Sequence, residues 1–140
     1  TDGSAGHDAT FPDADFFLMR AAEAYLNYAE ADARLNGGET TTEGTAAINA
    51  IRKRAHASTR EDKGYSLSDI CDEWSREFYF EGRRRMDLIR FNRYGGNVNY
   101  NWQWKGGTKD GRNFSKDLNI FAIPTNELTS NKNLIQNPGY

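Results

Sequence analysis

The segment of residues 73–93 gathers the acidic and basic side chains whose types and spacing could do chemistry. Glu73, Glu77 and Glu81 recur at every fourth position, and Asp87 follows them. Glycosidases use two carboxyl groups about 5–9.5 Å apart, a separation that successive turns of a helix can supply. However, arginines surround these acids, and nearby positive charge lowers the pKa of a carboxyl group, which spoils it as a general acid. A glycosidase is therefore the least favoured function, and we predict that the protein is not an enzyme.

The same acids need basic partners if the segment is helical. Like charges four residues apart repel one another on a helix, and Arg84 and Arg85 follow Glu81 by three and four residues. The planar guanidinium fork can hold carboxylates and stack on a ring at the same time, which lysine cannot do. We therefore predict a buried structural ionic clamp. Its members are Glu73, Arg76, Glu77, Glu81, Arg84 and Arg85.

A second candidate site lies in the glycine- and asparagine-rich stretch after residue 95. Tyr100, Trp102 and Trp104 alternate with amides, so an extended chain would place the three rings on one side. Sugars present apolar C–H faces to rings and hydroxyl groups to amides, which makes this pattern suitable for a glycan. The candidate substrate-binding residues are Tyr100, Asn101, Trp102 and Trp104. Packing of the rings beneath the loop, or against another part of the protein, explains the same pattern and stays open.

Other functions are disfavoured by the composition. A formal net charge of -2 provides no field that attracts polyanions, so we do not expect a nucleic-acid partner. Cys71 is the single cysteine, which leaves no internal disulfide and no cysteine zinc site. The two histidines, His7 and His56, do not form the Glu-x-x-His pairs of a carboxylate-bridged metal site. We predict no metal and no cofactor, and no apolar run is long enough to cross a bilayer.

The elements that would position these residues are mainly helices. Small and apolar residues recur at Leu18, Ala22, Tyr25, Ala29 and Ala33, the spacing of one helical face. We predict three main helices at about 15–36, 44–57 and 67–92, a long irregular loop at 95–117 and a C-terminal tail at 118–140 that begins as an extended run. The mix of small and large packing positions is typical of tetratricopeptide-like helix pairs. Residues 1–14 are small, polar and turn-forming, and we interpret them as a leader from a longer chain.

Five separated blocks resemble one known family. They are "LMRAAEAYLNYAEA", "AINAIRKRA", "REFYFEGRRRMDL", "IFAIPTNEL" and "NLIQNPGY". In this order they look like the C-terminal part of the SusD/RagB family, the glycan-binding outer-membrane lipoproteins of Bacteroidetes. The resemblance implies a mostly helical fold of tetratricopeptide-like helix pairs for residues 15–140. It also places most of the family's glycan contacts earlier in the chain, so none is carried over to individual residues of this sequence.

The resemblance also implies a cellular role. Such proteins capture an oligosaccharide at the extracellular face of the outer membrane and pass it to a SusC-like TonB-dependent transporter, on which they dock. Their lipid anchor is an N-terminal cysteine that is absent from this chain, and Cys71 does not match it because no lipobox precedes it. The alternative function is a helical-repeat scaffold that binds a protein partner along an exposed face without binding a ligand itself.

Overall fold

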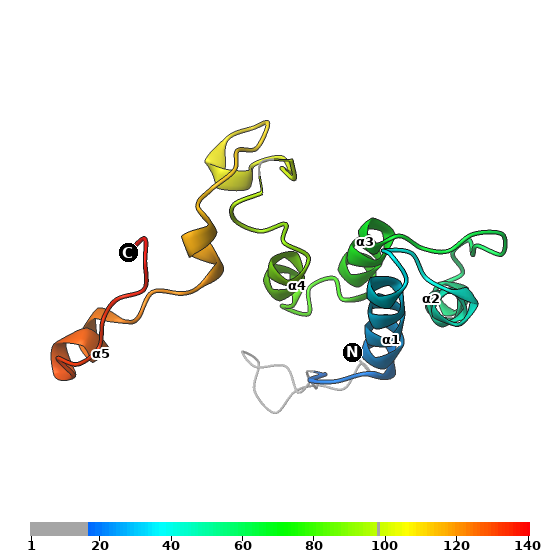
Figure 1. Ribbon diagram of the computed structural model, residues 1–140, viewed down its shortest axis with the longest axis horizontal. Helices are drawn as coiled ribbons and strands as arrows, with labels where there is room; N and C mark the ends of the chain where they lie inside the picture. Colours follow the sequence, from blue (N-terminus) through cyan, green and yellow to red (C-terminus); the bar gives the residue numbers. More distant parts are fainter. Residues whose placement is uncertain (1–16, 98) are drawn as a thin grey trace, which may run out of the picture. The chain divides into compact units, whose positions relative to one another are not determined.

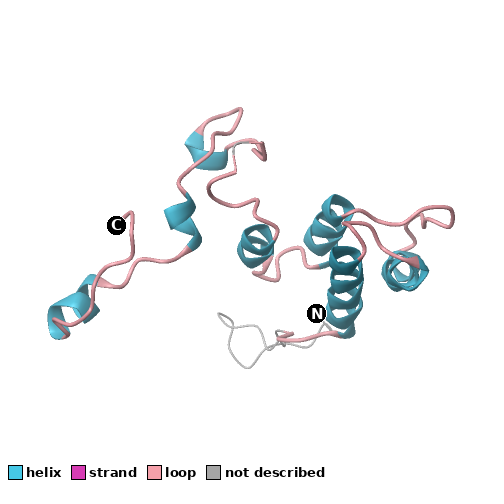
Figure 2. Ribbon diagram, viewed as in Figure 1, coloured by secondary structure: helices cyan, strands magenta, loops and turns pink. Residues whose placement is uncertain are grey.

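A computed structural model of the protein describes residues 17–97 and 99–140, and the predicted leader of residues 1–14 lies outside them. The chain divides into two compact units, residues 1–65 and residues 66–140. The described residues form helices joined by loops, with no strand among them (Figure 1, Figure 2). The mainly α class predicted from the sequence is confirmed. None of the helices in the described ranges combines the length and the apolar character needed to cross a membrane.

The first unit contains two helices that pack against each other, α1 (Ala21–Leu35) and α2 (Thr42–Arg54). The predicted first helix began at about 15, but Phe17–Arg20 are not helical and their three apolar side chains are exposed. Helix α1 ends where Gly38 N–H donates to Ala33 O at 2.7 Å, with Gly37 at a φ of 74°. This left-handed turn is the helix stop that glycine provides at low cost.

The buried face of the first unit consists of small and aliphatic side chains. They are Ala22, Leu26, Ala29 and Ala33 on α1, with Ala47, Ile48 and Ile51 on α2. The start of α2 lies close to α1, because a Cβ added to Gly44 would overlap the carboxylate of Asp32. The same carboxylate accepts hydrogen bonds from Thr41 N–H at 2.7 Å and from Thr41 Oγ1 at 2.9 Å. Asp32 therefore satisfies the N–H of the N-cap residue of α2 from the neighbouring helix.

The second unit begins with α3 (Leu67–Glu77), whose start is a capping box. Ser66 Oγ accepts from Asp69 N–H, and Asp69 Oδ2 accepts from Ser66 N–H at 2.9 Å. Apolar residues recur here at helical spacing, and Ile70, Cys71, Trp74 and Phe78 are all buried, whereas Leu67 at the start of the stripe is half-buried.

The predicted single helix at 67–92 is wrong, because the chain forms two helices in that range. Helix α3 ends at Glu77, and α4 (Arg84–Arg90) begins seven residues later. Phe80 has a φ of 63° and Gly82 a φ of 74°, so both leave the right-handed helical region. The charges spaced every four residues continue across this break, which is why the sequence pattern conceals it.

The rest of the second unit is loop with three short helical pieces: η1 (Lys105–Gly107), η2 (Lys116–Asn119) and α5 (Thr125–Ser130). The helical piece η2 takes up the first two residues of the tail, Leu118 and Asn119, so the predicted extended start holds only from Ile120, and α5 follows Pro124 directly. Proline fits the first turn of a helix because that turn needs no N–H from it. The tail is also held by side chains, since Gln136 bonds both Ile123 N–H at 2.8 Å and Ile123 O at 3.0 Å.

Candidate functional site

One ion pair joins two members of the predicted clamp. Arg76 donates to Glu73 Oε2 from Nη2 at 2.6 Å and from Nε at 3.1 Å, and Glu73 is buried while Arg76 is more exposed. The two residues lie three apart on α3, which is the spacing at which helical side chains meet. Glu77 and Glu81 are half-buried at the end of α3 and in the link that follows.

The contacts of Arg84 and Arg85 differ from the prediction, which paired both residues with Glu81. Because the helix breaks between Glu77 and Arg84, the helical relation that the pairing assumed does not exist. Arg84 instead donates to Cys71 O at 2.8 Å and to Tyr100 Oη at 3.2 Å. It therefore ties α4 to α3 and to the loop, through neutral oxygen acceptors.

Arg85 makes a similar link further along the chain. Its Nη2 donates to Leu118 O at 2.8 Å and to Asn119 O at 3.2 Å. Its guanidinium carbon lies 3.8 Å from the centre of the Phe121 ring, a distance at which an arginine and a ring attract each other. Arg85 thus anchors the C-terminal segment to α4.

The most deeply buried acid of this region is Asp87, which the clamp prediction omitted. Asp87 is 1% exposed, and its Oδ1 lies 3.0 Å from Arg90 Nη2. Burial raises the pKa of the Asp87 carboxyl group above its ordinary value, while the charges of Arg90, Arg83 and Arg84 oppose that rise. The spacing of Asp87 and Arg90, three residues apart, was a signal in the sequence that could have identified this pair.

Arginines and aromatic rings surround Asp87. The rings of Trp74 and Phe78 are stacked, with centroids 5.1 Å apart. Arg83 lies 5.0 Å from the Trp74 centroid and 4.8 Å from that of Phe78, and Arg90 lies 5.0 Å from Trp74. These arginines therefore make internal contacts of the second unit.

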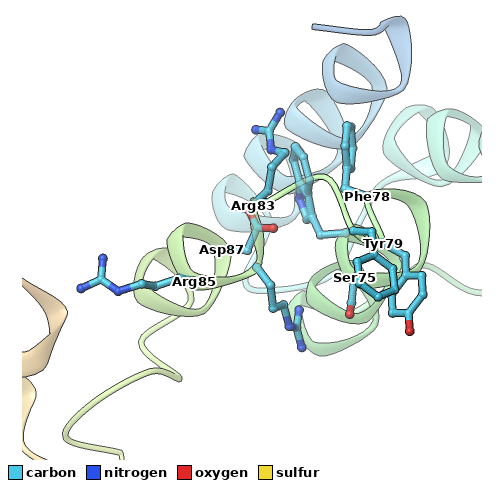
Figure 3. Close-up of a pocket in the computed structure, with 10 residues that line it drawn as sticks. Ser75, Phe78, Tyr79, Arg83, Arg85 and Asp87 are labelled. Carbon is cyan, nitrogen blue, oxygen red and sulfur yellow. The ribbon is translucent and has the colours of Figure 1, made fainter. Parts of the chain in front are cut away.

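A pocket of about 460 Å³ opens between α3 and α4, within the second unit. Figure 3 shows Arg85 pointing away from the other labelled side chains of the pocket, which include Arg83 and Asp87. The lining is Trp74, Ser75, Phe78, Tyr79, Phe80, Gly82, Arg83, Arg84, Arg85 and Asp87. Asp87 is the one carboxylate in that lining, whereas glycosidases place two around the scissile bond. This pocket accordingly gives no support to a hydrolytic mechanism.

The aromatic loop is not the extended segment that the alternation predicted. Lys105 N–H donates to Trp102 O at 3.0 Å, and Trp104 has a φ of 67°, so the chain turns between these residues. The rings of Tyr100 and Trp102 meet edge to face, with centroids 6.2 Å apart. Trp102 is 37% exposed and Trp104 is 66% exposed, and Asn101 between the first two rings is also exposed. The turn thus leaves Trp104 as the more accessible indole of the two.

Lys105 supports this turn from inside, and the sequence analysis missed it. The side chain is 1% exposed, and Nζ donates to Tyr100 O at 2.6 Å. Nζ also lies 4.8 Å from the Trp102 ring centroid and 5.0 Å from that of Phe114. Loss of hydration on burial lowers the pKa of Lys105. The sequence around this lysine carries no pattern that distinguishes a buried position from a solvated one.

No group of three His, Cys, Asp or Glu side chains in the described ranges gathers in a way that could hold a metal ion. Within the described residues of the second unit, two sites are of interest. One is the pocket between α3 and α4, and the other is the turn that carries Trp102 and Trp104.

Comparisons with known proteins agree on one family. The SusD family model matches residues 2–140. The starch-binding protein SusD of Bacteroides thetaiotaomicron is 44% identical over 140 residues, which are 100% of this chain and 24% of that protein. A solved SusD superfamily protein from Parabacteroides distasonis superimposes with a TM-score of 0.70 at 25% identity, over 89% of this chain and 27% of that one.

A second solved structure, the surface glycan-binding protein A of Bacteroides uniformis, superimposes with a TM-score of 0.69 at 28% identity. That match covers 87% of this chain and 27% of the solved chain. The chain therefore spans about a quarter of the length of these relatives.

Proposed function

Because the chain belongs to the SusD family, we propose that it is part of a non-catalytic protein that binds glycans at the cell surface for nutrient uptake. The observation that carries this proposal is the family match over residues 2–140 together with 44% identity to a protein named for starch binding. Starch is therefore the first glycan to test.

The turn at residues 100–104 is the part of this chain that we assign to ligand contact. Trp104 presents an indole that is 66% exposed, and Trp102 one that is 37% exposed. An exposed ring offers its face to the C–H groups of a sugar, and the amide of Asn101 can bond hydroxyl groups. Tyr100 has a mainly structural role in this turn, because its hydroxyl group already accepts a hydrogen bond from Arg84 at 3.2 Å.

The cellular setting follows from the family resemblance of the five sequence blocks. The protein stands at the extracellular face of the outer membrane, held by a lipidated N-terminus that precedes residues 1–140 in the full-length protein. It passes the oligosaccharide to a SusC-like TonB-dependent transporter. No step in this role needs a cofactor or a reacting group.

The test is a starch titration of the full-length protein with and without the two indoles. The double substitution Trp102→Ala and Trp104→Ala should weaken starch affinity about tenfold, the effect of losing roughly 1.4 kcal/mol of ring contact. Isothermal titration calorimetry measures the change. Phe17→Ala is the matched control, because it removes a ring that is 69% exposed at another place in the sequence. Unchanged affinity in the double variant removes the turn from the ligand site, and no binding to any glycan of a broad panel would refute the function itself.

The second candidate function is a protein-binding helical scaffold, and one surface of the first unit favours it. Tyr25 and Tyr28 are about half exposed on α1, and they line a shallow hollow of about 430 Å³ together with Ala46 and Ala47 of α2. Helix pairs of repeat proteins bind partners on such faces. If this face meets the transporter, Tyr25→Ser with Tyr28→Ser should abolish its capture in a pull-down and leave starch affinity unchanged. Loss of starch affinity with capture intact would contradict that assignment.

A further inference from the structure

The pocket between α3 and α4 has two large rings on its rim that point into solvent. Tyr79 is 74% exposed and Phe80 is 88% exposed, and their centroids lie 4.5 Å apart in an edge-to-face arrangement. Phe80 holds this position with a φ of 63°, a conformation that is uncommon and costly for a bulky residue. Within the described residues alone, this backbone strain at Phe80 gives no stability in return, because it keeps an apolar ring exposed.

The wall of the pocket carries an acceptor that the described residues leave without a donor. Asp87 is 1% exposed, and its Oδ2 accepts no hydrogen bond from them. Buried carboxylate oxygens in native proteins are nearly always bonded, because an unmade bond there costs free energy. A cation does not suit the place, since Arg83 and Arg84 share the lining and Arg90 already faces Oδ1. A neutral N–H or O–H donor suits the place beside Asp87 Oδ2.

We propose that a further polypeptide segment of this same protein fills the pocket, with an apolar side chain against Tyr79 and Phe80 and a hydrogen-bond donor directed at Asp87. The length of the relatives supports this occupant, because they extend over about four times the part that this chain matches. The composition of the pocket supports it as well. Exposed rings around a buried, incompletely bonded acid are typical of one half of a protein core or interface, which a neighbouring segment completes.

This inference does not depend on glycan binding, and its test measures protection rather than affinity. The test compares this chain with a chimera, the starch-binding SusD of Bacteroides thetaiotaomicron in which the matched 140 residues are replaced by this chain. Phe80→Cys places a thiol on the rim, and Ser75→Cys places one in the lining with a change of a single atom. Reaction with a thiol reagent should be at least about tenfold slower in the chimera than in this chain for both variants.

Ser68→Cys is the matched control, because it makes the same change on the exposed surface of α3 outside the pocket lining. Its thiol should react at the same rate in both proteins. Cys71 is buried, and the unsubstituted proteins give the background rate. Because Ser75→Cys is nearly isosteric, it keeps the comparison valid even if Phe80→Cys prevents the chimera from folding. Equal reactivity of the Ser75→Cys variant in the two proteins overturns the proposal, and so does equally strong protection of the Ser68→Cys variant.

Discussion

Residues 1–65 bury mainly alanine, leucine and isoleucine side chains on two helices, whereas residues 66–140 bury tryptophan, phenylalanine and lysine in addition to Ile70 and Leu88. In the first unit the main stabilising term is apolar area removed from water, which depends on volume and scarcely on direction. In the second unit arginine and glutamine side chains bond to backbone carbonyls, and such bonds depend on the position of each donor. Substitutions that remove buried side-chain volume should therefore destabilise the first unit most. Substitutions that move a hydrogen-bond donor should destabilise the second unit most.

The largest expected effect is a cavity in the first unit. Leu26→Ala removes a fully buried side chain of α1 and should lower the free energy of unfolding by about 2–5 kcal/mol. Urea denaturation followed by circular dichroism measures it. The matched control is Leu35→Ala on the same helix, where the side chain is 85% exposed and the change should stay within about 0.5 kcal/mol. Equal effects of the two substitutions would show that α1 is not packed as described.

The next effect tests donor geometry in the second unit without a change of charge. Arg84→Lys keeps the positive charge but cannot reach Cys71 O and Tyr100 Oη together, so it should cost about 1.5–3 kcal/mol. Thermal unfolding measures the loss. Arg112→Lys is the control, because its Nε bonds Gly106 O on the exposed surface, and it should change stability by about 0.5 kcal/mol at most. If Arg84→Lys is as mild as Arg112→Lys, directional bonds do not distinguish the second unit.

A smaller effect is expected in the C-terminal tail. Gln136→Ala removes the paired bonds to Ile123 N–H and O and should cost about 1 kcal/mol locally. Amide hydrogen exchange at Ile123 should become faster, because the Ile123 N–H loses its acceptor, Gln136 Oε1. Gln103→Ala, an exposed glutamine of the aromatic turn, is the control and should leave exchange at Ile123 unchanged. Slow exchange at Ile123 in both variants would mean that other contacts hold the tail.

The smallest effect is a pH dependence from Asp87. Burial raises its pKa in the folded protein above the ordinary 3.8, so the folded state binds the proton more tightly than the unfolded state does. Stability from this group is therefore greatest below the ordinary pKa and decreases as the pH rises to the folded-state pKa. Asp87→Asn should remove this decrease in the free energy of unfolding when it is measured from about pH 3 upward. Asp110→Asn, at an exposed position, should keep the decrease. A slope that survives Asp87→Asn would assign it to another group.

Several features could be predicted from local sequence because they depend on neighbours in the chain. The apolar stripe of α3 follows from its helical spacing, and the start of this helix follows from Ser66. The family could be recognised for a related reason, since its blocks preserve residue types in a fixed order. By contrast, the single helix over 67–92 was wrong, because the left-handed turn at Phe80 and Gly82 interrupts a charge pattern that reads as continuous.

The sequence by itself determined the helical class, the buried stripe and the kinds of side chain available for a site. Only the tertiary structure decided where those side chains went: Arg84 to a carbonyl of another helix, Lys105 beneath two rings, and Asp87 into the wall of a pocket. The physical reason is range, because periodicity reflects contacts within a few residues. The partner of a long polar side chain is chosen by whichever acceptor the folded backbone brings within about 3 Å.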